Sequence, residues 1–308
     1  MNLSEITQIV RKKAYELGFE LVGFSSAAFL KDESEKLKLW LNRGYAATMH
    51  WLERTFDKRV NPKLILPEAK SIISLGLNYY QKSKTKIKSN EGKVSIYAWG
   101  KDYHKVIENK FKHLEKFFKD TFFDSKNKFY VDYGPTMDKV WAVHGGLGWL
   151  GKHTNVINSH IGSWFFIGTV ITSLEFVYDE PVSDLCGNCR ICIDACPTGA
   201  IVDEYVLDAN LCISYQTIEN KDDIPESLKG KLSSYVFGCD ICQEVCPWNI
   251  KLQTETAEMD FASNPIESIS KEEIFQMNEK DFIEKYKTRP LLRAGLEKLK
   301  LNFLANRM

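Results

Sequence analysis

The sequence has no excess of charge of either sign, and it has no long hydrophobic run. Its 308 residues include 41 Lys and Arg and 41 Asp and Glu, so a global basic field that would attract nucleic acid is missing. Any such contact must depend on local patches. The most apolar stretch, residues 162–177, is interrupted by polar side chains such as Glu175 and is too short to cross a bilayer. The first twenty residues are too polar for a signal peptide, so we expect a cytoplasmic protein without membrane contact.

Histidines in a metal-binding pattern are also missing, and cysteine is confined to one part of the chain. The six histidines show neither zinc nor haem spacing. All eight cysteines lie between positions 186 and 246. Four of them form the run CGNCRICIDACP (186–197), and three form the run CDICQEVCP (239–247), which repeats the end of the first. The remaining Cys212 lies alone between the two runs.

This spacing is typical of a pair of [4Fe–4S] clusters. Three thiolates at two-residue intervals bind three irons of one cubane, and the fourth cysteine of such a run ligates the other cluster. A symmetric pair would need a cysteine at position 236, where the chain has Val236, so Cys212 is the candidate that completes the set. The predicted ligands are Cys186, Cys189, Cys192 and Cys246 for one cluster, and Cys196, Cys212, Cys239 and Cys242 for the other.

Zinc and disulfides are the competing interpretations of these cysteines. Two four-thiolate zinc sites would also use all eight side chains, but such sites usually pair Cys-x-x-Cys knuckles at longer separations. Disulfides persist in oxidising compartments, whereas a reducing cytosol keeps thiols free. The spacing therefore favours two [4Fe–4S] clusters over either alternative.

Helical and strand-like segments alternate irregularly through the first 175 residues, which indicates an α/β or α+β domain. The predicted helices are 4–17 (with Ser4 as N-cap), 33–43, 101–118 and 137–144, and the predicted strands are 19–24, 71–78, 128–132 and 163–172. Residues 82–93 form a lysine-rich loop that we expect to be mobile. From residue 266 onward the pattern is helical, and it ends in a basic segment with Lys285, Lys287, Arg289, Arg293, Lys298, Lys300 and Arg307.

A glycine-rich segment at 146–151 matches the pattern GxGxxG. A dinucleotide-binding fingerprint follows a strand and opens a helix, but here the preceding residues are helical and strand-like sequence comes later. We therefore interpret these glycines as points where the backbone closely approaches a flat ligand or another part of the chain.

Asp132 ends a predicted strand just before the turn at Gly134 and Pro135. One interpretation is a turn-capping aspartate, which is common at such positions. The other is an acid that faces a cofactor pocket, where burial would raise its pKa enough for it to hold a proton. The residues themselves leave both interpretations open.

Taken together and in this order, the motifs resemble those of the epoxyqueuosine reductases, which catalyse the last step of queuosine synthesis in tRNA. The resemblance covers nearly the whole chain. Beside the two cysteine runs it is carried by DKRVNPKLILPEAKSII (57–73), WGKDYH (99–104), VDYGP (131–135), GLGWLGKHTNVIN (146–158), GSWFFIGTVIT (162–172), CISYQTIE (212–219) and YVFGCDICQEVCPWN (235–249).

The resemblance implies an α+β fold with a cobalamin cofactor, in an N-terminal α/β corrinoid-binding catalytic domain similar to that of reductive dehalogenases. We divide the chain into a catalytic domain (1–175), a ferredoxin-like two-cluster module (176–255) and a helical basic C-terminal segment (256–308). Asp132 matches the family's proton donor. The cobalamin contacts implied are Arg59, Asp132, Lys152, His153, Val156 and Ser214.

The implied function is reduction of epoxyqueuosine to queuosine at the wobble position of tRNA. An external donor of the flavodoxin or ferredoxin type would load the clusters, which pass electrons to cobalt, while Asp132 protonates the departing epoxide oxygen. The low-valent cobalt would act on the epoxide by direct attack or by electron transfer, on a base flipped into the pocket. Longer family members carry a C-terminal helical-repeat domain that this chain lacks, so we expect the basic tail to bear more of the tRNA contact. We expect a monomer.

Two other functions fit part of the pattern. A corrinoid-dependent reductase of a small molecule, such as a dehalogenase, would share the cofactors. A ferredoxin-type electron carrier would share the cysteine runs, but it would not need the 175 residues that precede them.

Overall fold

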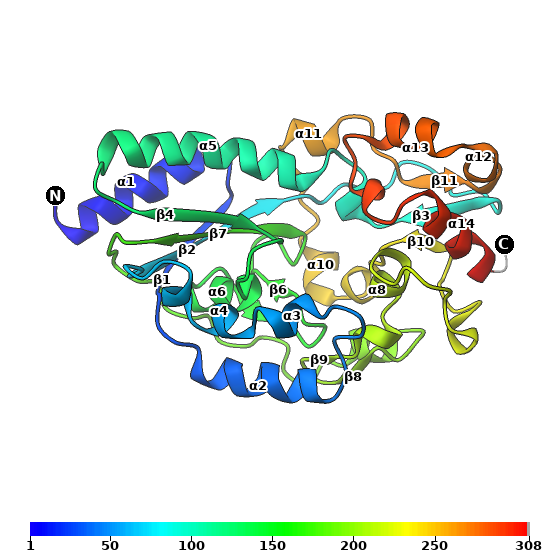
Figure 1. The fold of residues 1–308 in the computed structure, drawn as a ribbon, viewed down its shortest axis with the longest axis horizontal. Helices are drawn as coiled ribbons and strands as arrows, with labels where there is room; N and C mark the ends of the chain where they lie inside the picture. Colours follow the sequence, from blue (N-terminus) through cyan, green and yellow to red (C-terminus); the bar gives the residue numbers. More distant parts are fainter. Residues whose placement is uncertain (307–308) are drawn as a thin grey trace.

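A computed structural model describes residues 1–306 of the chain (Figure 1). An antiparallel four-stranded sheet lies in the N-terminal half, with strand order β1-β2-β7-β4. Its strands are β1 (Leu21–Ser26), β2 (Ser71–Asn78), β7 (Phe165–Thr172) and β4 (Asn127–Val131). β2 and β7 pair along their full length, from Ser71 opposite Thr172 to Asn78 opposite Phe165, and both strands are almost completely buried.

Helices cover both faces of this sheet, which explains why its central strands are apolar without alternation (Figure 1). On one face lie α1 (Leu3–Glu16) and α5 (Tyr103–Thr121). On the other lie α2 (Lys31–Asn42), α4 (Phe56–Val60) and α6 (Asp138–His144). The helices of the first face fit closely, because a Cβ atom at Gly168 in β7 would stand only 2.7 Å from the Phe111 ring on α5.

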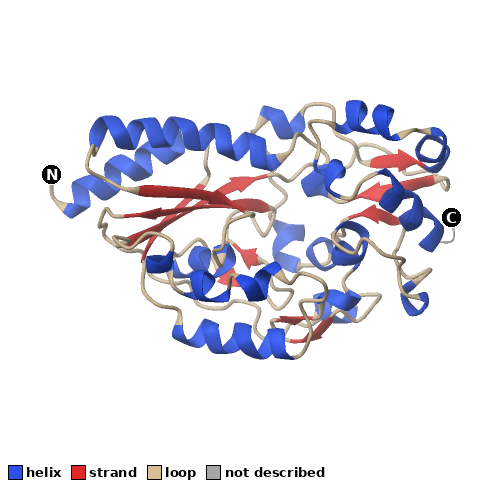
Figure 2. Ribbon diagram, viewed as in Figure 1, coloured by secondary structure: helices blue, strands red, loops and turns tan. Residues whose placement is uncertain are grey.

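A second, three-stranded sheet joins distant parts of the chain, at the right of Figure 2. Its order is β10-β3-β11, with β3 (Glu91–Val94) in the middle, β10 (Tyr235–Phe237) parallel to it and β11 (Ser268–Ser270) antiparallel. Each predicted segment contributes one of these strands. Side chains of the first sheet and of the C-terminal helices, such as Ile73 and Phe303, belong to one hydrophobic core. The division at 175 and 255 stays a prediction.

The other elements are short and mostly surround the cysteines. They are α3 (Trp51–Arg54), β5 (Trp149–Leu150), β6 (Val156–Ile157), α7 (Ile191–Asp194), β8 (Ile201–Asp203), β9 (Val206–Leu207), α8 (Ile213–Ile218), α9 (Ile241–Glu244), α10 (Pro247–Lys251), α11 (Met259–Ala262), α12 (Lys271–Gln276), α13 (Glu279–Tyr286) and α14 (Leu296–Ala305). Five 3₁₀ turns complete the fold, at Pro62–Leu64, Ile96–Ala98, Ala209–Leu211, Glu226–Leu228 and Pro290–Arg293. Helices together with mainly antiparallel sheets make the fold α+β, as predicted.

The predicted elements are present, with shifts at their ends. Asn2, not Ser4, caps α1: its side chain accepts from the Glu5 N–H while the Glu5 carboxylate accepts from the Asn2 N–H. The first strand lies two residues later than predicted, at Leu21–Ser26. In the lysine-rich segment, residues 91–94 form β3, and the Glu267 carboxylate accepts hydrogen bonds from Ser83 and Thr85.

The glycine-rich segment serves close packing of the chain on itself. It follows α6 and leads into β5, the reverse of a dinucleotide-binding context. A Cβ atom at Gly148 would lie 2.1 Å from the Ile157 carbonyl oxygen, and one at Gly23 would lie 1.9 Å from that of Gly145. The prediction that these glycines permit a close approach of backbones is therefore confirmed.

Candidate active site and cysteine clusters

A cavity of about 510 Å³ lies beside the end of β4, against the first sheet. Its walls are largely apolar and aromatic, with polar groups at a few points. The lining comprises Leu37, Trp40, Leu52, Arg59, Tyr97, Tyr103, Asp132, Thr136, Met137, Asp138, Lys139, Val140, Phe165, Phe166 and Ile167. A cavity with this lining is typical of a site for a large, flat organic ligand.

Asp132 follows β4 directly and has a left-handed backbone conformation, with φ of 60°. The Tyr133 N–H donates to the Val131 carbonyl oxygen at 2.6 Å, so Asp132 is the central residue of a three-residue turn. Such a turn with positive φ is rare and strained, and strain of this kind concentrates at functional sites. The turn directs the Asp132 carboxylate into the cavity.

Two neighbours on α5 interact with the Asp132 carboxylate. The Tyr103 hydroxyl donates to Oδ2 at 2.6 Å, and Nε2 of His104 lies 3.7 Å from the same oxygen. The surrounding cavity walls remove part of the water near Asp132 and raise its pKa, although 68% of the side-chain surface stays accessible. The interactions with His104 and Tyr103 outweigh this effect and hold the pKa below the usual carboxyl value. The expectation of a raised pKa is therefore wrong for this arrangement, because the sequence did not indicate these two partners.

His104 lies between two carboxylates. Its Nδ1 is 2.7 Å from Oδ1 of Asp102, the N-cap residue of α5, and its Nε2 faces Asp132. Burial lowers the pKa of His104, but its bonds to Asp102 and Asp132 raise it to about 9. The imidazole ring therefore carries a positive charge at neutral pH.

The lining of the cavity also includes the charged residues Arg59, Asp138 and Lys139. The Arg59 guanidinium donates to Thr55 Oγ1 at 2.9 Å and to the Thr136 carbonyl at 2.8 Å, which fixes it beside the cavity. Lys139 donates to the Thr154 carbonyl at 3.0 Å and to Asn155 at 2.8 Å. Burial raises the pKa of Asp138 and lowers that of Lys139.

Four cysteines of the first predicted set surround a smaller cavity of about 190 Å³. Cys186, Cys189, Cys192 and Cys246 line it together with Lys152, His153 and Trp248. Burial raises the pKa of Cys186, and it raises that of Cys192 to about 11, with help from the neighbouring thiols. Thiols with raised pKa values need a bound cation before they release their protons.

Two buried nitrogens beside this cavity make no hydrogen bond within the described part of the chain: Trp149 Nε1 and His153 Nε2. The Asn155 N–H donates to His153 Nδ1 at 3.2 Å, and burial lowers the His153 pKa to about 4. His153 is therefore neutral with its proton on Nε2. The Trp149 N–H opposes the rise in the Cys186 pKa, which places it beside that sulfur. The Trp149 and His153 N–H groups are therefore buried donors, and neither has an acceptor at hydrogen-bond distance among the described residues.

The four cysteines of the second predicted set are electrostatic neighbours. Burial raises the pKa values of Cys212, Cys239 and Cys242, and in each case the negative charge of another member raises it further. Cys196 differs, because hydrogen bonds from Thr198 and from the Ala200 N–H outweigh burial and lower its pKa. Cys242 is also influenced by Cys192, so the two sets lie close together.

The residues implied as cobalamin contacts lie in three places. Arg59 and Asp132 line the large cavity together. Lys152 and His153 lie instead at the cavity of the first cysteine set, where Lys152 donates to the Gly187 carbonyl and forms an ion pair with Glu204. Val156 packs in one apolar cluster with Phe165, and Ser214 lies beside Cys212.

The described cations of the basic tail are occupied by partners inside the protein. Lys285, Lys287 and Lys300 pair with Glu273, Glu284 and Glu297, and Arg293 with Glu219. Arg289 donates to two backbone carbonyls, and the largely buried Lys298 donates to the Asp222 carbonyl. Arg307 lies outside the described residues. This pairing disfavours the tail as a continuous tRNA-binding patch.

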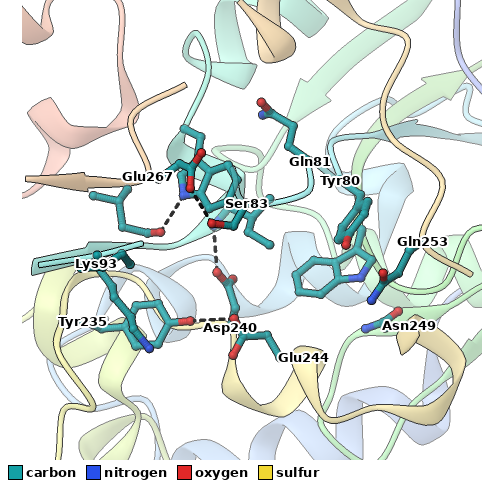
Figure 3. Close-up of a pocket in the computed structure, with 15 residues that line it drawn as sticks. Tyr80, Gln81, Ser83, Lys93, Tyr235, Asp240, Glu244, Asn249, Gln253 and Glu267 are labelled. Carbon is teal, nitrogen blue, oxygen red and sulfur yellow. Dashed lines mark hydrogen bonds between the residues drawn. The ribbon is translucent and has the colours of Figure 1, made fainter. Parts of the chain in front are cut away.

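A third cavity, of about 340 Å³, lies beside the segment that leads into α9 (Figure 3). Asp240 projects into it and accepts from Ser95 Oγ at 2.5 Å and from the Ile96 N–H at 2.8 Å. Lys93 and Tyr235 form one wall, and Glu267 lies at the loop above. These bonds fix the segment that carries Cys239 and Cys242 against β3.

Sequence reasoning missed Tyr103, His104, Lys139 and Trp149. The first two are the last residues of the motif WGKDYH, which carried the resemblance but offered no chemical reason for a role. Lys139 and Trp149 occur in a helix and a short strand, where neither had a distinguishing pattern.

Within residues 1–306, no helix is long and apolar enough to cross a membrane. In the same range, no three His, Cys, Asp or Glu side chains are grouped so that they could hold one metal ion.

Comparison with known proteins identifies two family matches. The family described as epoxyqueuosine reductase QueG, DUF1730 matches residues 59–133, and a 4Fe-4S double cluster binding domain matches residues 185–249. The epoxyqueuosine reductase of Leadbetterella byssophila is 41% identical over 97% of this chain and 98% of its own. That of Cellulophaga algicola is 45% identical over 79% of each chain.

Solved structures give the same relationship. A selenomethionine-labelled epoxyqueuosine reductase superimposes with a TM-score of 0.92 at 30% identity, over 99% of this chain and 82% of that one. Another, in complex with an epoxyqueuosine-modified tRNA stem loop, has the same TM-score and identity and is covered over 81%. A reductive dehalogenase shares only the fold, with a TM-score of 0.52 at 13% identity over 83% of this chain and 33% of that one. By sequence and by fold, the chain belongs to the epoxyqueuosine reductase family of oxidoreductases.

Proposed function

We propose that this protein reduces epoxyqueuosine to queuosine in tRNA, with cobalamin in the large cavity and electrons supplied through two [4Fe–4S] clusters. The observation that carries the proposal is Asp132, held in a strained turn with its carboxylate in an aromatic-lined cavity beside the cysteines. A family relative bound to a modified tRNA stem loop supports the substrate class.

The large cavity fits a corrinoid. Its wall offers Trp40, Phe165 and Phe166 to a flat macrocycle, and Arg59 and Lys139 offer donors to polar substituents. When bound, cobalamin would supply a low-valent cobalt that makes electrons available to the epoxide carbon. The protein itself would position the substrate, exclude water and deliver protons.

The cysteine sets fit two clusters with the predicted ligands. The first set surrounds one cavity, and the orphaned donors of Trp149 and His153 suit the sulfur atoms of a cluster there. The second set would hold the other cluster, with Cys212 as the ligand that the second run lacks. We propose a flavodoxin- or ferredoxin-type protein as the external electron donor and a monomer as the working form.

Proton supply follows from the overall reaction. Reduction of an epoxide to an alkene takes up two electrons and two protons and releases water, so the departing oxygen must be protonated. A base inserted in the cavity would come within reach of Asp132. The hydrogen bond from Tyr103 orients the Asp132 carboxylate.

The substrate base must leave the stacked anticodon loop to reach the cavity. A flipped base is usually read by aromatic stacking and hydrogen bonds. Tyr97 and Tyr103 line the cavity, and Tyr133, with 60% of its surface exposed, lies next to Asp132. We propose these three tyrosines as the contacts of the substrate base.

The test is anaerobic reconstitution with iron, sulfide and cobalamin, followed by a strong reductant and tRNA that carries epoxyqueuosine. Mass spectrometry of the digested tRNA should show conversion to queuosine. Omission of cobalamin is the control and should abolish the product. If the loaded protein turns over a halogenated aromatic and leaves the tRNA unchanged, the small-molecule alternative is correct.

A further inference from the structure

We infer that His104 is the store of the proton that Asp132 delivers, and that it is a positioning residue that acts through Asp132. The inference rests on the proposed function and adds a residue to it. It follows from a chain of three side chains, Asp102, His104 and Asp132, which runs from the start of α5 into the large cavity.

The geometry calls for a doubly protonated imidazole. Nδ1 of His104 lies 2.7 Å from an oxygen of Asp102, and Nε2 lies 3.7 Å from an oxygen of Asp132. An ionised carboxylate only accepts hydrogen bonds, and a neutral imidazole can donate from one nitrogen alone. Nδ1 is within hydrogen-bond distance of Asp102 and Nε2 within ion-pair distance of Asp132, so the imidazolium is the form of the ring that both carboxylates stabilise.

The first carboxylate is fixed by the fold. Asp102 caps α5, where its Oδ1 also accepts from the His104 N–H at 3.0 Å. These interactions hold the pKa of Asp102 below its usual value despite burial. Asp102 is therefore an anion across the neutral range, and it stays in place while His104 gains or loses a proton.

Aromatic stacking fixes the orientation of the imidazole. The Tyr103 ring stacks on it with centroids 4.1 Å apart, and the Tyr133 ring stacks at 5.8 Å. The ring keeps 31% of its side-chain surface accessible, which leaves a path for a proton from solvent. The Asp132 side chain is itself 68% accessible, so the ring becomes its path to water once a ligand fills the cavity.

Other charges nearby do not alter this balance. On α5 the cation Lys105 interacts with Asp102, and Glu108 accepts a hydrogen bond from the Tyr133 hydroxyl. Arg59 and Lys139, on α4 and α6, interact with Asp132, and Asp138 belongs to the same cavity lining. Arg293, in the 3₁₀ turn Pro290–Arg293, also interacts with Asp132 and with Tyr103. The two carboxylates in contact with the ring dominate, and they raise the His104 pKa to about 9 although burial opposes them.

The proton count of the reaction gives His104 its role. The first proton passes from His104 Nε2 to Asp132 Oδ2 and from there to the oxygen as the C–O bond of the epoxide breaks. The second proton follows the same route after His104 is recharged from solvent, and the oxygen leaves as water. The two electrons come from the external reductant through the clusters. The 3.7 Å gap to Asp132 must close by about 1 Å, or be bridged by water, for each transfer.

The first experiment reads the protonation state of His104 without turnover. In the cluster-loaded protein with ¹³C-labelled histidine, NMR should show one resonance, absent from His104→Gln, that titrates near pH 9. In Asp102→Asn the same resonance should titrate at least one pH unit lower. A midpoint near the ordinary value of about 6.5 in the unmodified protein would overturn the inference.

The second experiment compares pH–rate profiles in single turnover. The unmodified protein should keep its rate from pH 6 to 8 and lose it above pH 9. In His104→Gln, Asp132 must take its proton from water, so the rate should fall about tenfold for each unit of pH over the same range. The dissociation constant for tRNA should stay within twofold. An unchanged profile in His104→Gln would contradict the inference.

His113→Gln is the matched control, since His113 is exposed on the same helix and should leave both profiles unchanged. If the unmodified protein forms no queuosine at all, the proposed function fails. The NMR titration still decides whether the Asp102–His104–Asp132 chain holds a proton.

Discussion

At the scale of single residues, Asp132 combines a strained backbone with a carboxylate in the cavity. Asparagine tolerates the left-handed conformation as well as aspartate does, so Asp132→Asn should preserve the turn while removing the acid. We expect the rate of queuosine formation to fall by about 10²–10⁴-fold. Mass spectrometry of single-turnover reactions measures it. Iron and cobalt contents, which should be unchanged, serve as the control, and a rate within threefold of the unmodified protein would exclude Asp132 as proton donor.

Trp149 is the second residue whose role is testable alone. Hydrogen bonds to cluster sulfurs raise the reduction potential of a cluster. Trp149→Phe removes the buried, unpaired Nε1–H beside Cys186 and keeps most of the ring that packs on Trp248. We expect a more negative midpoint potential for one cluster in a redox titration followed by EPR. The matched control is Trp164→Phe, which removes another buried, unpaired Nε1–H that does not line the cavity of the first cysteine set. Equal potentials in all three proteins would contradict the assignment.

The sequence indicated the residues with strong local patterns and missed those defined by contacts across the fold. The cysteine spacing led to the two ligand sets without any structure. The pKa of Asp132 could not be foreseen in the same way, because its partners Tyr103 and His104 precede it by 29 and 28 residues and come from another element. Hydrogen bonds of this kind leave no periodic signal.

At the scale of elements, β10 explains why the second cysteine run is one ligand short. Val236, at the position where a symmetric pair of clusters would have cysteine, is completely buried in the core. A Cβ atom at Gly92 would lie 2.3 Å from its Cγ1 atom, which shows how tightly β10 packs on β3. The strand needs an apolar side chain there, and α8 supplies Cys212 from its N-cap instead.

Loss of Cys212 should therefore not be repaired by a cysteine at 236. We expect Cys212→Ser to hold about four irons in place of about eight, because one cubane loses a ligand. The double variant Cys212→Ser, Val236→Cys should hold no more, since the new thiol points into the core. Iron and sulfide assays with EPR measure both. Recovery of eight irons in the double variant would show that β10 can turn its side chain toward the cluster.

Long strands were predictable from the sequence, whereas short strands were not. The long strands β2 and β7 were predicted, with β7 beginning two residues late, since eight-residue segments that are mostly apolar and buried on both faces give a strong signal. β3 and β11 have four and three residues and pair with partners more than 140 residues away. Strands this short acquire their conformation from neighbours that local periodicity does not include.

At the scale of the whole molecule, the charge balance limits how tRNA is held. The described cations of the tail have partners in the protein, and Arg293, although paired with Glu219, lies close enough to the cavity to interact with Asp132 and Tyr103. Lys105 follows His104 in the chain and is exposed, and it adds a second cation at the same rim of the cavity. We therefore expect a small local contact with phosphates.

Replacement of Lys105 or of Arg293 should lower the affinity for tRNA, and it should make that affinity less dependent on salt. For Lys105→Gln and for Arg293→Gln, we expect the slope of log affinity against log salt to decrease by about one. Lys287→Gln is the matched control, because it removes another exposed cation of the same tail that, like Arg293, is paired with a glutamate. Filter binding at several salt concentrations measures the slopes. Equal slopes in all variants would move the tRNA contact elsewhere.

The three-stranded sheet also determines how the protein can be divided. Its central strand, β3, comes from the first half of the chain, and both strands that flank it come from beyond residue 230. A fragment that stops at 175 would leave both edges of β3 unpaired, and its free N–H and C=O groups could pair with strands of other chains. We therefore expect that the cysteine-bearing module does not fold separately from the rest of the chain. Expression of either half alone should yield aggregates.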